Sequence, residues 1–303
     1  MNNLQGTSQE AGSGHLPSEL LAFAAQVLGP SELIADCSWG HRMSSVMSLR
    51  DRTGATWFLK QHTDRERYLD EVAAYHRWVP ALGSRAPRLR AADDSLHAVI
   101  LSAVPGESPA WPADTIDDGD DDKHAEEAAV QHGAGALLRR FHDGQPALPW
   151  DDFAAAKAEE FEQLAPFAAV LLTSRELAAA RSQVGELTGR SCPGRVACHR
   201  DYTPRNWLVD AGTVYVVDFE WSRLDVWVSD LARLHLGIWA TRPDLREAFI
   251  SGYGRDLAGA DEAIMHGCAV LTGVWLLIKA HERGQQSFED GSRIALLRLM
   301  SNR

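Results

Sequence analysis

The sequence predicts an α+β protein with two lobes: a small N-terminal β-sheet lobe with one helix, and a larger, mostly helical C-terminal lobe. Two observations predict this fold class. Short β-prone runs are concentrated before residue 108, whereas apolar residues beyond residue 123 recur at helical spacing. One β-prone stretch, residues 207–219, interrupts the helical half. The 303 residues, of which 45% are hydrophobic, are enough to bury a sizeable core.

The N-terminal lobe is expected to start with a helix over residues 17–29, where Leu and Ala recur at helical spacing. Ser18 can cap this helix, and Gly29 followed by a proline ends it. Three β-prone runs follow, over residues 33–39, 44–51 and 55–62. The last two are predicted to form a hairpin across residues 52–54, so a small sheet begins here.

The remaining elements of this lobe are a helix over residues 64–79, a turn region over 90–94 and a strand that starts at 97 and stops at Pro105. Residues 1–15 are polar and lack periodicity, so we expect a disordered tail. The expected lobes span residues 16–104 and 105–303.

The C-terminal lobe is preceded by residues 113–123, which are dense in acidic side chains and are predicted to form a loop. Helical spacing then predicts helices over residues 124–142, 152–171, 174–188, 226–240, 243–253, 260–282 and 291–300. Two β-prone runs, 207–209 and 214–219, are joined by residues 210–213, whose Asp and Gly suit a tight reversal. We therefore expect one hairpin within a helical lobe.

Charge and composition exclude several classes of partner. Asp and Glu total 42 and Lys and Arg total 30, so the formal net charge is −12 and a nucleic-acid partner is not expected. No apolar run approaches the ~18 residues of a membrane span, and no leader segment is visible, so we expect a cytoplasmic protein without a membrane partner. The four cysteines lack paired metal-ligand spacing, which indicates reduced thiols. No obligate protein partner is inferred.

The hairpin region gathers the side chains that carry chemistry. Asn206 precedes the first strand and Asp218 lies near the end of the second, so pairing of the strands brings a carboxamide and a carboxylate together. Such oxygens are the ligands that Mg²⁺ prefers. Asp201, five residues before Asn206, can accept a proton from an attacking hydroxyl. This constellation predicts phosphoryl transfer.

These residues also carry a resemblance to a known family. The sequence His199-Arg200-Asp201, then Asn206, then Asp218-Phe219-Glu220, resembles the catalytic loop and metal motif of the protein-kinase-like superfamily. Within it the chain resembles the aminoglycoside phosphotransferase and choline kinase branch. The resemblance implies a two-lobed protein-kinase-like fold with ATP or GTP bound between the lobes, and Mg²⁺ held by Asn206 and Asp218.

The resemblance extends upstream and downstream of the catalytic loop. It implies that Lys60 contacts the nucleotide phosphates, that Glu71 holds this lysine, and that the backbone from Ser102 to Val104 receives adenine. Residues 137–144, LLRRFHDG, resemble the Leu-His signature helix of small-molecule kinases, and Asp230 resembles the aspartate that braces their catalytic loop.

The chain departs from the family pattern at several positions. Arg200 stands where small-molecule kinases usually have Gly, and Glu220 replaces the Gly that ends the metal motif, as in choline-kinase-like members. There is no Gly-rich repeat before Ser44 and Ser45, whose backbone region is nevertheless expected to cover the phosphates. Arg205, four residues after Asp201, is placed as in tyrosine kinases, where it neutralises the transferring phosphate.

Three functional classes compete. A protein kinase needs a long activation segment, yet only nine residues separate Glu220 from Asp230. A pseudokinase would be expected to have lost Lys60, Asp201, Asn206 or Asp218, and all four are present. An active small-molecule kinase remains, with a hydroxyl as acceptor.

The acidic balance and the resemblance favour a cationic antibiotic as the acceptor, either an aminoglycoside or a basic peptide of the tuberactinomycin type, which phosphorylation would inactivate. The alternatives are choline, homoserine, a sugar or a macrolide. The candidate side chains for binding a cationic acceptor are Glu220, Asp225, Glu282, Glu289 and Asp290.

Overall fold

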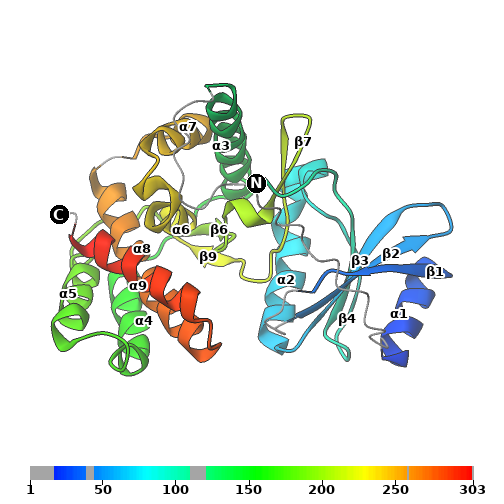
Figure 1. The fold of residues 1–303 in the computed structure, drawn as a ribbon, viewed down its shortest axis with the longest axis horizontal. Coiled ribbons are helices and arrows are strands. Elements are labelled where there is room, and N and C mark those ends of the chain that lie inside the picture. Colours follow the sequence, from blue (N-terminus) through cyan, green and yellow to red (C-terminus); the bar gives the residue numbers. More distant parts are fainter. Residues whose placement is uncertain (1–16, 39–43, 110–120, 258, 302–303) are drawn as a thin grey trace, which may run out of the picture. The chain divides into compact units, whose positions relative to one another are not determined.

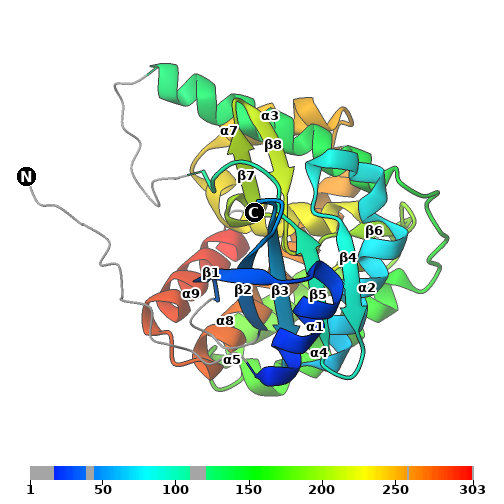
Figure 2. The ribbon, with the colours of Figure 1, turned by 90° about the vertical axis from the view of Figure 1, so that its right-hand side faces the viewer.

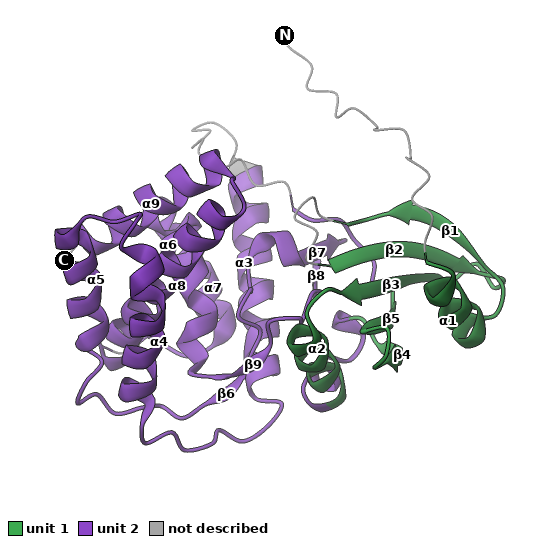
Figure 3. Ribbon diagram, turned by 90° about the horizontal axis from the view of Figure 1, so that it is seen from below, with its two compact units in different colours: residues 1–76, 87–103 green, residues 77–86, 104–303 purple. Residues whose placement is uncertain are grey.

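The computed structural model describes residues 17–38, 44–109, 121–257 and 259–301 of the chain. The expected tail over residues 1–15, and most of the acidic run 113–123, lie outside these ranges. The chain divides into two compact units (Figure 3): unit 1 comprises residues 1–76 and 87–103, and unit 2 comprises residues 77–86 and 104–303. The predicted α+β class is confirmed, with a sheet in unit 1 and mostly helices in unit 2 (Figure 1).

Unit 1 is built on a five-stranded antiparallel sheet with the order β1-β2-β3-β5-β4. Its strands are β1 (Ser31–Asp36), β2 (Ser44–Asp51), β3 (Thr56–His62), β4 (Leu89–Asp93) and β5 (Ala98–Ser102). The predicted hairpin across residues 52–54 is present, with Gly54 at a φ of 86° in the turn.

The prediction of a turn over residues 90–94 was wrong, because Leu89–Asp93 forms the edge strand β4. Its neighbour β5 is apolar and buried, so pairing on both sides satisfies the backbone of β5. That pairing overrides the low strand propensity of Arg90 and Asp93. The true turn follows, where the Asp93 carboxylate accepts the N–H groups of Ser95 and Leu96.

Helix α1 (Ser18–Leu28) lies against this sheet (Figure 2). Its residues Leu20, Phe23 and Ala24 belong to one core cluster with Met47, Leu49, Leu59, Ala98 and Ile100. The expected cap by Ser18 was wrong: Ser18 is the first residue of the helix, and Pro17 holds the capping position. The fixed φ of proline suits the start of a helix, and Gly29, at a φ of 73°, ends it as predicted. Helix α2 (Arg65–Arg77) follows β3.

Unit 2 holds most of the predicted helices. Its helices are η1 (Val79–Arg85), α3 (Asp121–His142), α4 (Phe153–Ala168), α5 (Ser174–Gly185), η2 (Pro204–Asn206), η3 (Trp227–Leu231), α6 (Ala232–Leu236), η4 (Ile238–Ala240), α7 (Pro243–Tyr253), α8 (Gly259–Glu282) and α9 (Gln286–Ser301). The single helix expected over 226–240 is therefore three short helices. Gly237, with φ of −102° and ψ of −110°, breaks the chain between α6 and η4.

Helices α3 and α7 pack side by side in unit 2 (Figures 1 and 2). The contact requires glycine on both helices. A Cβ atom on Gly135 would lie 2.1 Å from the carbonyl oxygen of Phe249, and one on Gly252 would lie 1.9 Å from that of His132. Both distances are below van der Waals contact, so larger side chains would force the two helices apart.

Helix α8 is long and apolar enough to cross a membrane by length and composition, which corrects the expectation that no run approaches that length. In its most apolar window, 72% of the residues are buried inside the protein. Such burial is typical of the central helix of a core, and α8 contacts α4, α5, α6 and α9.

The predicted hairpin is present as β7 (Trp207–Asp210) and β8 (Thr213–Val216), with Ala211 and Gly212 at φ angles of 45° and 74°. Two positive φ values match the type I′ turn that joins right-twisted strands. The second strand ends at Val216, before the predicted end at residue 219, because Asp218 has a φ of 68° and leaves the strand conformation. A second pair, β6 (Val196–Cys198) with β9 (Arg223–Asp225), was not predicted.

Candidate active site

In unit 1, Lys60 and Glu71 form a buried ion pair. The Lys60 Nζ atom on β3 lies 3.1 Å from Oε2 of Glu71 on α2, whose side chain is 0% exposed. His62, which was not singled out from the sequence, lies two residues further along β3, on the same face, with its Nε2 atom 2.6 Å from the same oxygen. Two groups therefore fix the Glu71 carboxylate, and Glu71 in turn fixes the position of the Lys60 ammonium.

The other candidate nucleotide contacts lie on strands or at a strand end. Ser44 and Ser45 begin β2, opposite His62 and Gln61 of β3. Ser102 is the last residue of β5. Its N–H donates to the carbonyl of Arg88, and its hydroxyl accepts a hydrogen bond from the N–H of Arg88. Val104 is the first residue after unit 1. The Ser102 N–H is thus used within the sheet, which leaves Val104 as the better candidate of the two for a base contact.

Asp201 lies in the loop after β6, and its carboxylate is held by two arginines. The side chain is 2% exposed, with Oδ2 bound by Arg205 and Oδ1 bound by Arg233 of α6. The sequence prediction missed Arg233, although it stands three residues after Asp230 in the same motif. Both carboxylate oxygens are therefore oriented by charged donors.

The charge around Asp201 is strongly positive on one side. Burial lowers the pKa of Arg233, and the guanidinium groups of Arg205 and Arg283 lower it further. Burial also opposes the charge of Arg205, but the carboxylates of Asp201, Asp218 and Glu220 outweigh this effect and raise its pKa. Arg205 thus lies among three carboxylates, and its side chain is still 47% exposed.

Asn206 and Asp218 are connected through the backbone of the hairpin. The Asn206 side-chain nitrogen donates to the carbonyl of Asp201 at 2.8 Å, and the Asn206 carbonyl accepts the N–H of Val217 at 3.0 Å. Its side-chain oxygen receives no hydrogen bond from any described residue. Asp218 follows at a φ of 68°, an uncommon conformation for a residue with a side chain.

This donor set fits a hard divalent cation. An amide oxygen without a donor and a carboxylate are the oxygen ligands that Mg²⁺ takes alongside water and phosphate. The left-handed backbone at Asp218 is the kind of strain that is concentrated at functional sites.

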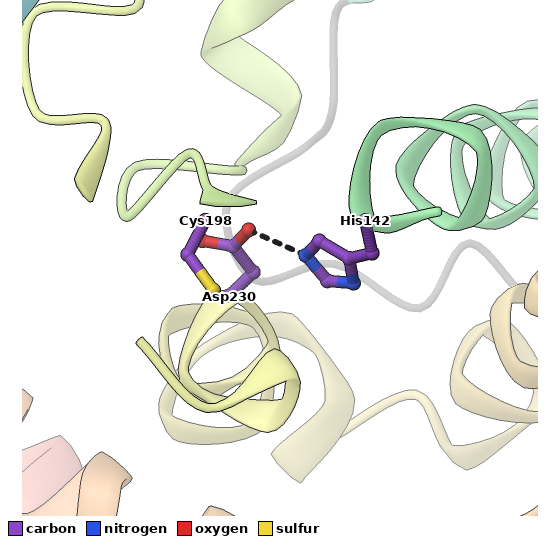
Figure 4. A group of neighbouring side chains, drawn as sticks. All are labelled: His142, Cys198 and Asp230. Atoms are coloured by element: carbon purple, nitrogen blue, oxygen red, sulfur yellow. Dashed lines mark hydrogen bonds and ion pairs between the residues drawn. The ribbon is translucent and has the colours of Figure 1, made fainter. Parts of the chain in front are cut away.

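Asp230 on η3 contacts the loop before Asp201 and also His142, the second of which Figure 4 shows. Its carboxylate accepts the N–H groups of His199 and Arg200, and it accepts a hydrogen bond from Nε2 of His142 on α3 at 3.0 Å. Nδ1 of His142 in turn lies 2.8 Å from the hydroxyl of Tyr253. The loop before Asp201 is thus tied to α3 and α7 through one buried carboxylate.

Cys198 joins His142 and Asp230 in the one group of potential metal ligands found in the described part of the chain. Burial raises the pKa of the Cys198 thiol well above its usual value. Its sulfur donates to the carbonyl oxygens of Asp225 and Val226. Because metals bind the thiolate, these contacts identify the group as a hydrogen-bonded brace.

Arg200, which replaces the usual Gly of small-molecule kinases, belongs to a second, partly buried network. It adopts a φ of 64°, and its guanidinium lies 3.7 Å from Asp225 and 3.5 Å from Glu160 of α4. Lys157, also on α4, contacts the same two carboxylates at 2.9 Å and 3.1 Å. Burial raises the pKa of Asp225, but Lys157 and Arg200 outweigh it, so the net shift is downward and the carboxylate stays charged.

Replacing Lys157 by Ala is expected to destabilise the protein by about 3–5 kcal/mol, because the buried Asp225 carboxylate loses its closest cation. Lys279→Ala is the matched control, since Lys279 pairs with Glu282 at a largely exposed site and should cost about 1 kcal/mol or less. Chemical unfolding at neutral pH measures both. Equal losses in the two variants would show that the buried pair contributes no more than a surface pair.

The candidate acceptor-binding carboxylates differ in their surroundings. Asp225 is committed to Lys157 and Arg200 inside unit 2. Glu220 is buried beside the catalytic loop and acts on Arg205. Glu282 and Glu289 lie at the end of α8 and the start of α9, paired with Lys279 and His281. The structure therefore brings Glu220 close to the catalytic loop and leaves Glu282 and Glu289 partly exposed.

Comparisons with known proteins concern the fold and the family of the chain. The chain is similar in structure to a thermostable mutant of aminoglycoside phosphotransferase APH(4)-Ia, with 15% identity, a TM-score of 0.65, and 92% of this chain and 98% of that chain covered. It is similar to APH(2")-IIa in a gentamicin complex, with 13% identity, a TM-score of 0.65, and 94% and 98% covered. It is also similar to a macrolide 2'-phosphotransferase type I, with 15% identity, a TM-score of 0.64, and 92% and 96% covered.

At such identities the likeness establishes the fold. No curated protein sequence matches the chain. A model of the family described as "Phosphotransferase enzyme family" matches residues 41–265, most of the chain.

Proposed function

Because the chain belongs to the phosphotransferase enzyme family, we propose that it transfers the γ-phosphoryl group of ATP, or of GTP, to a hydroxyl of a small molecule. One observation carries this proposal: the Asp201 carboxylate is held by two arginines, and the Asp201 carbonyl accepts a hydrogen bond from Asn206, which together with Asp218 offers oxygens suited to Mg²⁺. In this reaction the acceptor oxygen forms a bond to the γ-phosphorus, the bond to the β–γ bridging oxygen breaks, and a proton leaves the hydroxyl.

Asp201 is the base that takes this proton. The Asp201 carboxylate accepts a hydrogen bond from the substrate hydroxyl and thereby orients it. Arg233 keeps one oxygen of this carboxylate in a fixed position. Arg205 is more exposed than Arg233 and can turn toward the transferring phosphoryl group, whose negative charge its guanidinium would neutralise. The two arginines thus have different roles: Arg233 holds the base, and Arg205 serves the phosphoryl group.

Asn206 and Asp218 are the residues that would hold Mg²⁺, and Lys60 is the residue that would contact the nucleotide phosphates. When bound, Mg²⁺ neutralises charge on the phosphate oxygens. Glu71 and His62 keep the Lys60 ammonium in place. Ser44, Ser45 and Val104 complete the proposed nucleotide contacts.

We further propose that the acceptor is a cationic antibiotic, an aminoglycoside or a basic peptide of the tuberactinomycin type. The net charge of −12 and the partly exposed Glu282 and Glu289 support it. Structural neighbours include APH(2")-IIa, whose structure was solved as a complex with gentamicin. Glu220 is the proposed acceptor carboxylate nearest the catalytic loop.

A second acceptor class is favoured by one specific observation. The guanidinium groups of Arg205 and Arg283 both act on that of Arg233, which binds Asp201, and this accumulated positive charge would repel a polycation. An uncharged acceptor such as a macrolide or a sugar would not meet this repulsion. The structural similarity to a macrolide 2'-phosphotransferase is compatible with such an acceptor.

Nucleotide consumption against a panel of aminoglycosides, basic peptides, macrolides and small alcohols, with mass detection of the product, tests the reaction directly. The active acceptor is then used to vary ionic strength at constant Mg²⁺-nucleotide. A polycation should show an acceptor KM that rises steeply with salt, because screening weakens several charge contacts at once.

A neutral acceptor serves as the control, since its KM should change little over the same salt range. A flat profile for the best substrate would reject the cationic class and leave the kinase reaction standing. Failure of every hydroxylated compound to gain a phosphate would reject the proposed reaction itself.

A further inference from the structure

Unit 2 contains a cavity of ≈ 410 Å³ that the phosphotransfer reaction does not use. It lies among α6, η4, α7, α8 and α9, and its polar lining consists of His235, Trp239, Arg246, Glu262, His266 and Arg298. Leu236, Pro243, Leu299, three alanines and Gly259 form the rest of the wall. The volume falls within the range of small-molecule sites, and the combination of an apolar wall with a few polar groups is typical of them.

The cavity is separate from the catalytic loop. Arg283, which acts on Arg233 beside Asp201, directly follows the C-terminal end of α8. Glu262 and His266 line the cavity from the first turns of the same helix. The cavity nevertheless reaches α6, because His235 and Leu236 line it and Arg233 of the same short helix binds Asp201. Asp201, Arg205 and Arg233 are not among its lining residues.

The wall offers more hydrogen-bond donors than acceptors. Trp239 is 4% exposed, and its indole N–H has no acceptor among the described residues. The Nε atom of Arg246 is also buried and has no acceptor among them. Arg298 makes no ion pair with any described residue. The carboxylate of the cavity wall, Glu262, already pairs with another nitrogen of Arg246. Buried donors such as the Trp239 indole N–H and Nε of Arg246 normally have partners, so these two groups point to a missing acceptor, and the exposed Arg298 lines the same cavity.

We propose that this cavity is a binding site for a small organic carboxylate with an apolar body. The carboxylate would accept hydrogen bonds from Arg298 and from the donors of Trp239 and Arg246. The apolar body would lie against Leu236, Pro243 and Leu299. A bidentate guanidinium contact favours a carboxylate over a neutral amide or alcohol of the same shape.

His235 provides a signature of this occupancy. Burial, together with the neighbouring His266 and Arg246, lowers its pKa to about 4. The charged or titratable groups around it are His266 and Glu262 of α8, Arg246 of α7 and Arg298 of α9. A bound carboxylate adds a negative charge beside them and should raise the pKa of His235 from about 4 toward its ordinary value.

The test uses benzoate as the probe on the full chain, with benzyl alcohol as the uncharged control of the same shape and inorganic phosphate as the anion without an apolar body. We expect saturable binding of benzoate, measured by calorimetry and as a rise in Tm. Benzyl alcohol and phosphate should bind at least about tenfold more weakly, since each lacks one half of the recognition. In histidine NMR spectra, benzoate should shift the titration of the His235 signal, assigned with His235→Gln.

Arg298→Gln and Trp239→Phe should each weaken benzoate binding by about tenfold, while Arg175→Gln, an exposed arginine of α5, should leave it unchanged. Trp239→Phe retains a ring next to Phe249 and removes only the N–H donor and part of the ring area. Undiminished binding in both Arg298→Gln and Trp239→Phe would overturn the site. An unchanged His235 titration in the presence of saturating benzoate would do so as well.

Discussion

Replacing Asp201 by Asn is expected to lower turnover by ~10²–10⁴-fold and to leave nucleotide affinity nearly unchanged. The base acts on the acceptor hydroxyl, so its loss affects the chemical step and not the bound triphosphate. Asn retains the shape of the side chain, and the contact between Asn206 and the Asp201 backbone carbonyl does not depend on the carboxylate. The loop should therefore keep its position while it loses the proton acceptor.

Steady-state turnover and nucleotide binding by calorimetry measure this result. Asp210→Asn is the matched control, because Asp210 is exposed at the end of β7 and should leave turnover unchanged. Near-normal turnover in Asp201→Asn would remove Asp201 from the role of base. A parallel loss of nucleotide affinity would instead assign it to the nucleotide site.

Replacing Asp218 by Ala is expected to weaken Mg²⁺-nucleotide binding and to reduce turnover by at least about 10²-fold, because the carboxylate that would hold the metal is lost. Asn206→Ala should have the same effects to a smaller degree. Asp218 has a φ of 68°, which Asn tolerates better than Ala, so Asp218→Asn separates loss of charge from backbone strain.

Magnesium titrations of nucleotide binding and of turnover distinguish these variants. A right-shifted magnesium dependence in both Asp218→Asn and Asn206→Ala is the expected result. An unaltered dependence in both, with normal unfolding curves, would be incompatible with a metal site at these two residues.

Much of the fold follows from local sequence patterns. β-Prone and apolar runs predicted β2, β3 and β5 to within a residue or two, and helical spacing predicted α1, α2, α3, α7 and α8. The errors occurred where pairing decides conformation. Arg90 and Asp93 have low strand propensity, yet β4 forms because β5 needs a neighbour. The three-residue strands β6 and β9 are too short to carry a period, and they exist only because they pair with each other.

The identity and order of the proposed catalytic groups could be predicted from the sequence, because one short hairpin with recognisable turn residues links Asp201, Asn206 and Asp218. The charges that surround these groups follow from tertiary packing. Arg233 reaches Asp201 from α6, and Lys157 holds Asp225 from a helix 68 residues away in the sequence. Side chains on different elements meet through packing, and helical periodicity specifies which face is buried but not what it contacts. For that reason Asp225 could be predicted as a carboxylate near the site, while its commitment to Lys157 and Arg200 could not.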